Sequence, residues 1–215
     1  MKLEIDNVEL YFGKKLILKS VFLTAEENQV VGIFGRNGSG KTSLLKIIYG
    51  SLQPKYKLLR INKKPVLKKF YKTDWVAYLP QYHFLPTHLN LQQIFSAYKI
   101  SWAIFIENFE SFAIYKNSKP KALSGGERRI IEVYLILNSS SKVLLLDEPF
   151  SNLAPLIIEK IKLLIEEKKK SKIIIITDHF YRDVLAISDE IYLARNQQIS
   201  AIKSKKDLID YGYLI

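Results

Sequence analysis

A glycine-rich octapeptide places the strongest constraint on how this 215-residue chain can fold. Residues 35–42 read Gly-Arg-Asn-Gly-Ser-Gly-Lys-Thr and match the pattern G-x-x-x-x-G-K-[ST] at every specified position. An apolar run at 30–34 precedes the octapeptide, and residues 42–50 have the pattern of a helix that ends at glycine. The glycines permit a tight turn whose backbone amides face inward at the positive end of a helix. The sequence therefore predicts the strand, loop and helix of a phosphate-binding loop.

The side chains of this loop have separate expected roles. Lys41 can reach the β- and γ-phosphates of a nucleoside triphosphate, and the Thr42 hydroxyl can bind Mg²⁺. The alternative, an ordinary glycine-rich turn before a helix, does not account for the Lys-Thr pair or for the strand in front. The residues that we expect to bind the phosphates are Gly35, Asn37, Gly38, Ser39, Gly40, Lys41, Thr42 and Ser43.

The composition indicates a globular protein without cysteine chemistry. Hydrophobic residues make up 48% of the chain, which is enough for a sizeable core. The absence of cysteine excludes disulfides and cysteine-based metal sites, and it suits a reducing cytoplasm. No apolar run approaches the ~20 residues of a membrane-spanning helix. Residues 1–6 carry charges where a signal peptide would be apolar, so we expect neither a membrane span nor a secretion signal.

The net charge of +12 leaves the partner open between nucleic acid, an anionic membrane surface and no partner at all. The lysines are dispersed, and the densest runs, at 168–170 and 203–206, lack interleaved aromatic residues on which bases could stack. We therefore expect no specific nucleic-acid partner. The pattern favours a solvated lysine-rich surface, which anionic lipid headgroups could also face.

Alternating apolar residues ahead of the loop predict antiparallel strands, at 3–5, 8–12 and within 16–23. Tyr11 or Phe12 could supply an aromatic face on which a nucleotide base stacks. The pattern by itself favours an ordinary aromatic residue of a strand core.

The middle of the chain changes from strand to helix periodicity. A strand at 75–79 is followed by Gln81, which by itself is a polar loop residue. From 82 to 117, apolar residues recur at three- and four-residue spacing, as at Leu91 and Ile94. The sequence therefore predicts an inserted helical segment.

A second glycine pair stands at the start of the next predicted helix. Ser124 and Glu127 have the spacing of a capping box in front of an apolar run. Capping does not require Gly125 and Gly126 between them, because glycine costs about 1 kcal/mol relative to alanine in a helix. Close approach of a ligand oxygen to the backbone amides would explain the pair.

Two further apolar strands end in polar residues. The run at 143–146 ends in Asp147 and Glu148, where open α/β sheets bind ligands. Asp147 could hold Mg²⁺ and Glu148 could polarise a water molecule. The run at 172–177 ends at His179, which taken alone is more often structural than catalytic.

The remaining elements are simpler. Residues 155–170 have helical periodicity, and 191–194 with 198–202 suggest a terminal hairpin. A short closing helix is predicted at 205–211.

Together these motifs resemble the ATP-binding cassette (ABC) family over nearly the whole chain. The phosphate loop alone would fit many nucleoside-triphosphatases, whereas L-S-G-G-E at 123–127 upstream of a strand ending in D-E-P is highly specific. The resemblance implies an α/β fold: a P-loop NTPase (RecA-like) core with a mostly parallel sheet, an N-terminal antiparallel β subdomain and a short inserted helical subdomain. Residues 1–215 would form one nucleotide-binding domain, with 1–82 and 140–215 as the catalytic core and 83–139 as the helical subdomain.

The resemblance also implies a role for each motif. Phe12 would stack on adenine, with Tyr11 as the alternative, and Glu148 would be the general base. Gln81 and His179 would sense the γ-phosphate. Catalysis is thereby assigned to Glu148, His179, Gln81 and Lys41, and Mg²⁺ binding to Thr42, Gln81 and Asp147.

The implied partners lie outside the chain. Ser124, Gly125 and Gly126 would contact ATP held by a second ABC ATPase subunit, so that a head-to-tail dimer, expected to be a homodimer, is the competent unit. Separate transmembrane permease subunits would be driven by the cycle of ATP binding and hydrolysis. The protein would then lie peripherally on the cytoplasmic face of the inner membrane.

Two departures from the family pattern affect these expectations. The family usually has aspartate after S-x-L, where this chain has Ala154, which puts communication across the dimer and the hydrolytic rate in doubt. Only 43 positions separate Gln81 from Ser124, a short helical subdomain for the family.

Within the family, residues 123–129, 147–150 and 177–179 are most similar to the ATPase of lipopolysaccharide export, and branched-chain amino acid importers have a related ATPase. The principal hypothesis is an ATPase subunit of a transporter. A soluble ATPase of macromolecular or cofactor assembly and a slowly hydrolysing regulatory module are the alternatives.

Overall fold

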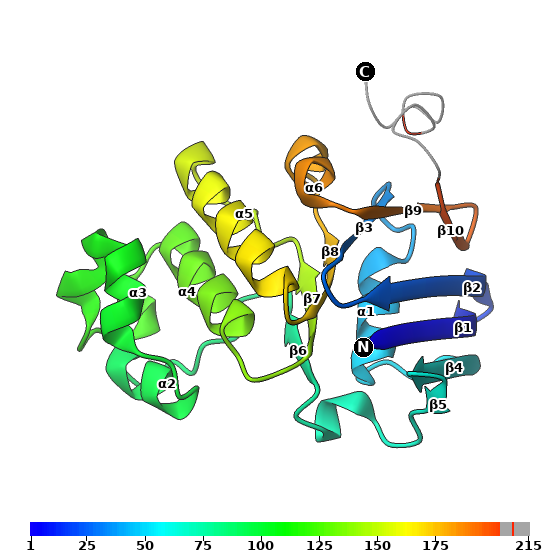
Figure 1. Ribbon diagram of the computed structural model, residues 1–215, viewed down its shortest axis with the longest axis horizontal. Helices are drawn as coiled ribbons and strands as arrows, with labels where there is room; N and C mark the ends of the chain where they lie inside the picture. The colour runs from blue at the N-terminus through cyan, green and yellow to red at the C-terminus, as the bar shows by residue number, and fades with distance from the viewer. Residues whose placement is uncertain (203–207, 209–215) are drawn as a thin grey trace.

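The structure, a computed structural model, describes residues 1–202 and Leu208. Two sheets and a group of helices make up this part of the chain (Figure 1). The helix predicted at 205–211 lies outside the described residues, Leu208 excepted.

The larger sheet is mostly parallel, as the sequence predicts. Its strands are β3 (Val30–Gly35), β6 (Val76–Leu79), β7 (Val143–Asp147), β8 (Ile173–Thr177), β9 (Glu190–Arg195) and β10 (Gln198–Ala201). They lie in the order β10-β9-β3-β8-β7-β6, and only the pairing of β9 with β10 is antiparallel. Every residue of β3, β7 and β8 is buried, which is why these strands are continuous apolar runs.

The register of the central strands brings two motifs together. Asp147, the last residue of β7, lies opposite Thr177, the last residue of β8. Glu148 and Asp178 therefore leave the sheet next to each other at its carboxyl edge. This edge is where open α/β sheets bind their ligands.

The smaller sheet is antiparallel, as predicted for the N-terminal part. It contains β1 (Lys2–Phe12), β2 (Lys15–Glu26), β4 (Tyr56–Ile61) and β5 (Lys64–Pro65), in the order β2-β1-β4-β5. Buried residues alternate along much of β1 because one face of the sheet packs on the core. Helix α1 (Lys41–Tyr49) buries apolar residues in the same cluster as residues of both sheets.

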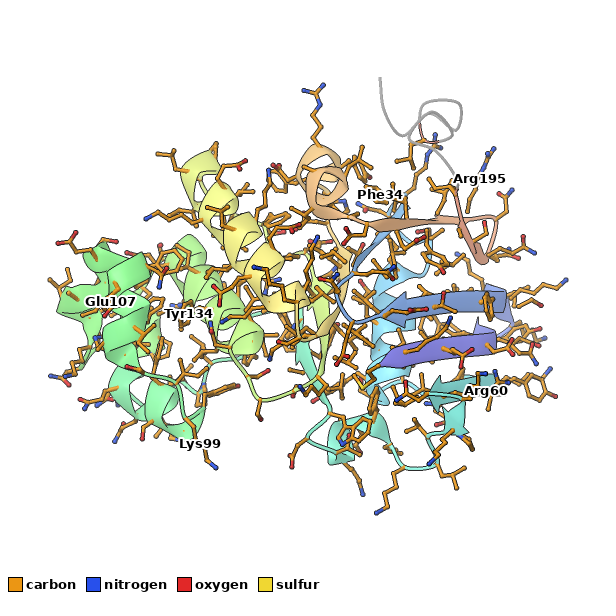
Figure 2. The ribbon with its side chains drawn as sticks, viewed as in Figure 1. Phe34, Arg60, Lys99, Glu107, Tyr134 and Arg195 are labelled. Carbon is orange, nitrogen blue, oxygen red and sulfur yellow. The ribbon has the colours of Figure 1, made fainter. Side chains whose placement is uncertain are left out.

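The inserted segment is helical and has an aromatic core. Its elements are α2 (Leu91–Ala97), α3 (Trp102–Asn108), the 3₁₀ turns η2 (Glu110–Tyr115) and η3 (Pro120–Ala122), and α4 (Gly125–Leu137). The ring of Tyr134 on α4 (Figure 2) lies 4.9 Å from that of Phe105 on α3. These residues share one buried cluster with Leu144 and Ile174 of the sheet, so the helical segment packs directly on the core. The division at 83 and 140 stays a prediction.

Two helices complete the described chain. α5 (Pro155–Lys169) matches the predicted helix to within one residue. α6 (Tyr181–Ile187) was not predicted from the sequence, because, unlike α2 and α3 of the same length, it has no capping side chain that marks its start.

Candidate functional site

The phosphate loop has the strand, turn and helix that its sequence predicts. Gly35 and Gly40 have φ angles of 151° and 98°, which residues with a side chain rarely adopt. A Cβ atom on Gly35 would lie 2.7 Å from the carbonyl oxygen of Ala194, and one on Gly40 would lie 2.6 Å from Leu18. The hydroxyl of Ser39 is buried and has no hydrogen-bond partner. The loop thus leaves a polar group free for a ligand to satisfy.

The ammonium group of Lys41 bridges this loop. Its Nζ donates to the carbonyl oxygens of Gly35 at 2.7 Å and Arg36 at 3.2 Å. Burial lowers the pKa of Lys41, while the nearby carboxylates of Glu148 and Asp147 act to raise it. The group is therefore held over the loop by weak acceptors that phosphate oxygens could replace.

A cavity of about 480 Å³ opens in front of the loop. Phe12 lines this cavity and its side chain is 53% exposed. Tyr11 does not line it, and its ring lies 5.5 Å from the ammonium of Lys55. The structure therefore favours Phe12 over Tyr11 as the aromatic residue of the site. The full lining is Phe12, Lys15, Ile17, Asn37, Gly38, Ser39, Gly40, Lys41, Thr42, Ser43, Gln81, Glu148 and His179.

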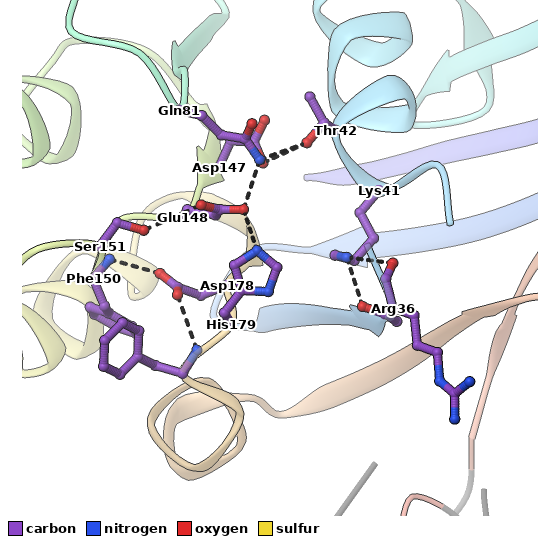
Figure 3. A network of polar contacts seen from close by, with 12 residues as sticks. Arg36, Lys41, Thr42, Gln81, Asp147, Glu148, Phe150, Ser151, Asp178 and His179 are labelled. Atoms are coloured by element: carbon purple, nitrogen blue, oxygen red, sulfur yellow. Dashed lines mark hydrogen bonds and ion pairs between the residues drawn. The ribbon is translucent and has the colours of Figure 1, made fainter. Parts of the chain in front are cut away.

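The residues predicted to bind metal meet beside the start of α1. Thr42 Oγ1 donates to Asp147 Oδ1 at 3.0 Å, and Gln81 Nε2 donates to Thr42 Oγ1 at 3.1 Å (Figure 3). Tyr78 donates its hydroxyl to the other Asp147 oxygen at 2.8 Å. Burial raises the pKa of Asp147, and the hydrogen bonds from Tyr78 and Thr42 oppose that shift. A hydroxyl and a carboxylate stand together at the mouth of the phosphate loop.

Glu148 lies between the two predicted sensor residues. Its Oε1 atom accepts a hydrogen bond from Gln81 Nε2 at 2.8 Å and is 2.7 Å from His179 Nε2 (Figure 3). Ser151 donates to the other carboxylate oxygen at 3.3 Å. Three motifs that are far apart in the sequence thus converge on one carboxylate.

Asp178, for which no role was predicted, connects two loops beside the cavity. Its carboxylate is buried and accepts from the backbone amides of Phe150 at 2.8 Å and Phe180 at 3.1 Å. Burial raises its pKa, and these amide hydrogen bonds act in the opposite direction. Asp178 therefore ties the turn after Glu148 to the loop that carries His179.

Arg129 of α4 is a further residue that sequence reasoning missed. It is 2% exposed, and its guanidinium donates to the carbonyl oxygens of Pro80 at 2.6 Å, Asp147 at 2.5 Å and Glu148 at 2.8 Å. One side chain thereby connects the helix after the glycine pair to the residue before Gln81 and to the acidic strand end. The available signal was an arginine directly before the apolar run that begins at Ile130, but spacing along the sequence does not reveal its partners.

Glu132 supports Arg129 from one turn further along α4. Its carboxylate is fully buried, lies 3.6 Å from the Arg129 guanidinium, and accepts from the amide of Phe84 at 3.0 Å. His83 Nδ1 is 3.1 Å from the same carboxylate. The residues on both sides of Gln81 are therefore attached to α4.

The glycine pair lies outside the cavity. Ser124 and Glu127 form the predicted capping box, with reciprocal hydrogen bonds of 3.2 and 2.7 Å. A Cβ on Gly126 would lie 2.6 Å from the carbonyl oxygen of Asn152. Packing within this chain therefore explains why position 126 is glycine. A Cβ on Gly125 would meet only His83, at 3.7 Å. Five predicted site residues do not line the cavity. Ser124, Gly125 and Gly126 lie outside it, whereas Gly35 and Asp147 accept hydrogen bonds from the lining residues Lys41 and Thr42.

Ala154 occupies the N-cap of α5 and offers no capping side chain. Ala154→Asp is expected to stabilise the protein by about 1 kcal/mol, because aspartate can accept from a backbone amide of the first turn and has a favourable charge there. Thermal unfolding should show an increase of about 2–4 °C. Ala154→Asn should give a similar gain through capping alone, and Ala154→Leu should give none. An unchanged Tm in both polar variants would contradict this explanation.

Comparison with known proteins decides the family. The model of the family described as "ABC transporter" matches residues 18–151, which include the phosphate loop, Gln81, the glycine pair and the acidic strand end. The chain belongs to the ABC transporter family. It is an ATP-binding ATPase subunit of a transporter, of the kind that drives a separate permease.

Individual relatives agree with this assignment. The lipopolysaccharide export ATP-binding protein LptB of Haemophilus influenzae is 27% identical over 95% of this chain and 91% of its own length. A probable iron chelatin transport ATP-binding protein of Helicobacter pylori is 32% identical over 71% of this chain and 67% of its own. A solved ATP-binding subunit of an ABC transporter has a TM-score of 0.83 at 20% identity, covers 99% of this chain and 94% of its own, and confirms the fold. Among the described residues, no helix has the length and apolar character needed to cross a bilayer.

Proposed function

We propose that the cavity binds MgATP and that Glu148 activates the water molecule that attacks the γ-phosphate. One observation carries this proposal: the Glu148 carboxylate is held by Gln81 and His179 at the edge of the cavity that the phosphate loop lines. A general base must lie within hydrogen-bonding reach of the group that it deprotonates. Gln81 and His179 would orient the carboxylate and respond to the γ-phosphate.

The other cavity residues would bind the nucleotide. Phe12 would stack on adenine, and the amides of residues 35–40 would surround the phosphates at the positive end of α1. Lys41 would exchange the carbonyl oxygens of Gly35 and Arg36 for phosphate oxygens, which carry more charge. The buried Ser39 hydroxyl would gain its missing partner.

Thr42 and Asp147 fit a magnesium ion. Mg²⁺ prefers hard oxygen ligands and is usually bound through one or two protein oxygens together with substrate phosphates. The Thr42 hydroxyl and the Asp147 carboxylate provide such oxygens next to the phosphate loop, and the Gln81 amide lies beside them. When bound, the ion would neutralise charge on the β- and γ-phosphate oxygens.

The second half of the site would come from another copy of this chain. Ser124, Gly125 and Gly126 stand at the amino end of α4 and outside the cavity. In a head-to-tail homodimer, each such end would face the ATP of the partner. Binding of ATP would then close the dimer, and hydrolysis would open it.

The proposed cargo is a lipid. LptB relatives, named for lipopolysaccharide export, match most of the chain. A transporter subunit with this role would lie peripherally on the cytoplasmic face of the inner membrane, attached to its permease.

Lys41→Ala is expected to weaken ATP binding by about ten- to a hundredfold, because charge-assisted hydrogen bonds contribute roughly 1.5–3 kcal/mol. Isothermal titration calorimetry with ATP would measure the dissociation constant. Lys168→Ala, which removes a lysine of α5 paired with Glu167, should leave it unchanged. Equal ATP affinity of wild type and Lys41→Ala would argue against the proposed phosphate site.

Ala154 favours a second candidate, a module that holds ATP but hydrolyses it slowly. In that case Ala154→Asp would raise turnover, while Ala154→Asn, which also caps α5, would not.

Co-purification in detergent distinguishes a role in transport from a role in macromolecular or cofactor assembly. A membrane-embedded partner supports transport, and a solely soluble partner supports assembly.

A further inference from the structure

A second cavity lies away from the nucleotide site, on the segment that joins β5 to β6. It measures about 520 Å³ and is lined only by residues between 61 and 75. Leu67 at its rim is 91% exposed and Trp75 is 48% exposed. The segment forms the lower edge of the molecule in Figure 1, and its side chains extend outward below the labelled Arg60 in Figure 2. Large apolar groups are thus presented together at one edge.

The same segment is strongly cationic. Residues 62–75, here called the lysine-aromatic edge, contain five lysines and a single acidic residue, Asp74. In the described part of the chain none of these five lysines pairs with a carboxylate, whereas five lysines elsewhere do. Burial lowers the pKa of the neighbouring Lys57, and the charge of Lys69 lowers it further. The lysines are Lys63, Lys64, Lys68, Lys69 and Lys72.

The backbone of this edge is held in place. Phe70 is 2% exposed and belongs to the buried cluster under α1, next to Gly50 at the end of that helix. The Val66 amide donates to Leu59 at 2.8 Å, and Thr73 Oγ1 donates to the Phe70 carbonyl at 2.6 Å. Leu67 and the five lysines are exposed on this anchored backbone. A partner could bind there without first ordering the segment.

We propose that the lysine-aromatic edge binds the surface of a bilayer that contains anionic phospholipids. Lysines near a membrane surface are attracted to anionic headgroups, and tryptophan and tyrosine prefer the interface. Leu67 would insert among the first acyl carbons, since membrane binding scales with buried apolar area as well as charge. The almost fully exposed Leu67 favours a bilayer over nucleic acid, because an aliphatic side chain gains from burial among acyl chains, whereas only the aromatic residues of the edge could stack on bases. This contact is additional to the attachment to a permease and does not depend on the transported substrate.

Vesicle binding tests the proposal directly. The protein should bind phosphatidylcholine vesicles that contain phosphatidylglycerol at least about tenfold more strongly than vesicles of phosphatidylcholine alone. Lys64→Glu combined with Lys68→Glu should reduce that binding by about tenfold or more. Lys116→Glu combined with Lys121→Glu changes the net charge equally in the helical segment and should alter it less than twofold. Leu67→Ser should weaken binding several-fold without changing the charge.

The fluorescence of Trp75 provides an independent test of membrane binding. The chain has two tryptophans, and Trp102 is 9% exposed, so Trp102→Phe leaves Trp75 as the reporter. Its emission should shift to shorter wavelength with anionic vesicles. If that variant does not fold, the difference between wild type and Trp75→Phe gives the same signal.

Several results would overturn the proposal. These are equal binding to both kinds of vesicle, unchanged Trp75 emission, or equal losses in the two charge-reversal pairs. Binding of duplex DNA without vesicle binding would assign the edge to nucleic acid instead, and binding only to an acidic protein would assign it to that partner. ATP affinity measured on the same variants should stay at the wild-type value, which separates this contact from the nucleotide site.

Discussion

Glu148→Gln is expected to reduce the ATPase turnover number by about 10²- to 10⁴-fold, the contribution typical of a general base. Glutamine has nearly the same shape and can still accept hydrogen bonds from Gln81 and His179, but it cannot take a proton from water. ATP binding should therefore persist while hydrolysis stops. Phosphate release would measure the rate, and size-exclusion chromatography with ATP should show a trapped dimer.

The matched control for this substitution is Glu159→Gln. Glu159 lies on α5 and pairs with Lys162, and the Lys162 side chain is mostly buried while that of Glu159 is exposed. Its replacement should leave turnover within about twofold of wild type, because Glu159 does not line the cavity and Lys162 keeps its ion pair with Asp183. If Glu148→Gln hydrolysed ATP at the wild-type rate, Glu148 would not be the base. If the variant were slow but formed no ATP-dependent dimer, this would contradict the proposal that a second copy of the chain completes the ATP site.

Arg129→Met is expected to destabilise the protein by about 3–5 kcal/mol, because it leaves the buried Glu132 carboxylate without its guanidinium partner. It also removes the donors to the carbonyl oxygens of Pro80, Asp147 and Glu148. Urea denaturation would measure the loss of stability. Arg182→Met, at an exposed position of α6, should have little effect.

The double variant Arg129→Met with Glu132→Met separates stability from positioning. Replacing a buried ion pair with apolar residues is often close to neutral, so most of the stability should return. The turnover number should nevertheless stay low, because neither Gln81 nor the acidic strand end is attached to α4 any longer. The KM for ATP should change less than kcat, since the phosphate loop is intact. Recovery of turnover together with stability would make Arg129 a purely structural residue.

Local sequence patterns predicted most of the fold and most of the residues that line the candidate nucleotide site. The phosphate loop, the buried strands and the capping box are each specified by residues a few positions apart, and the structure has all three where expected. Asp147, Glu148 and His179 were found because they end apolar strands, and parallel strands end at the same edge. Helix α6 was missed because no capping residue marks its start, whereas Asn90 and Ser101 mark the equally short α2 and α3.

The sequence alone determined that a phosphate loop, two acidic residues and a histidine stand at strand ends, because these features depend on neighbours in the chain. The tertiary structure decided which distant groups they meet. Arg129 reaches Pro80 across 49 positions and Asp178 reaches Phe150 across 28, contacts that exist only because of the strand order and the packing of α4 on the sheet. The choice of Phe12 over Tyr11 likewise depends on which face of β1 turns toward the cavity, since neighbouring strand residues point to opposite faces. Side-chain partners of this kind have no periodic signal in the sequence, since they are set by how the elements pack in space.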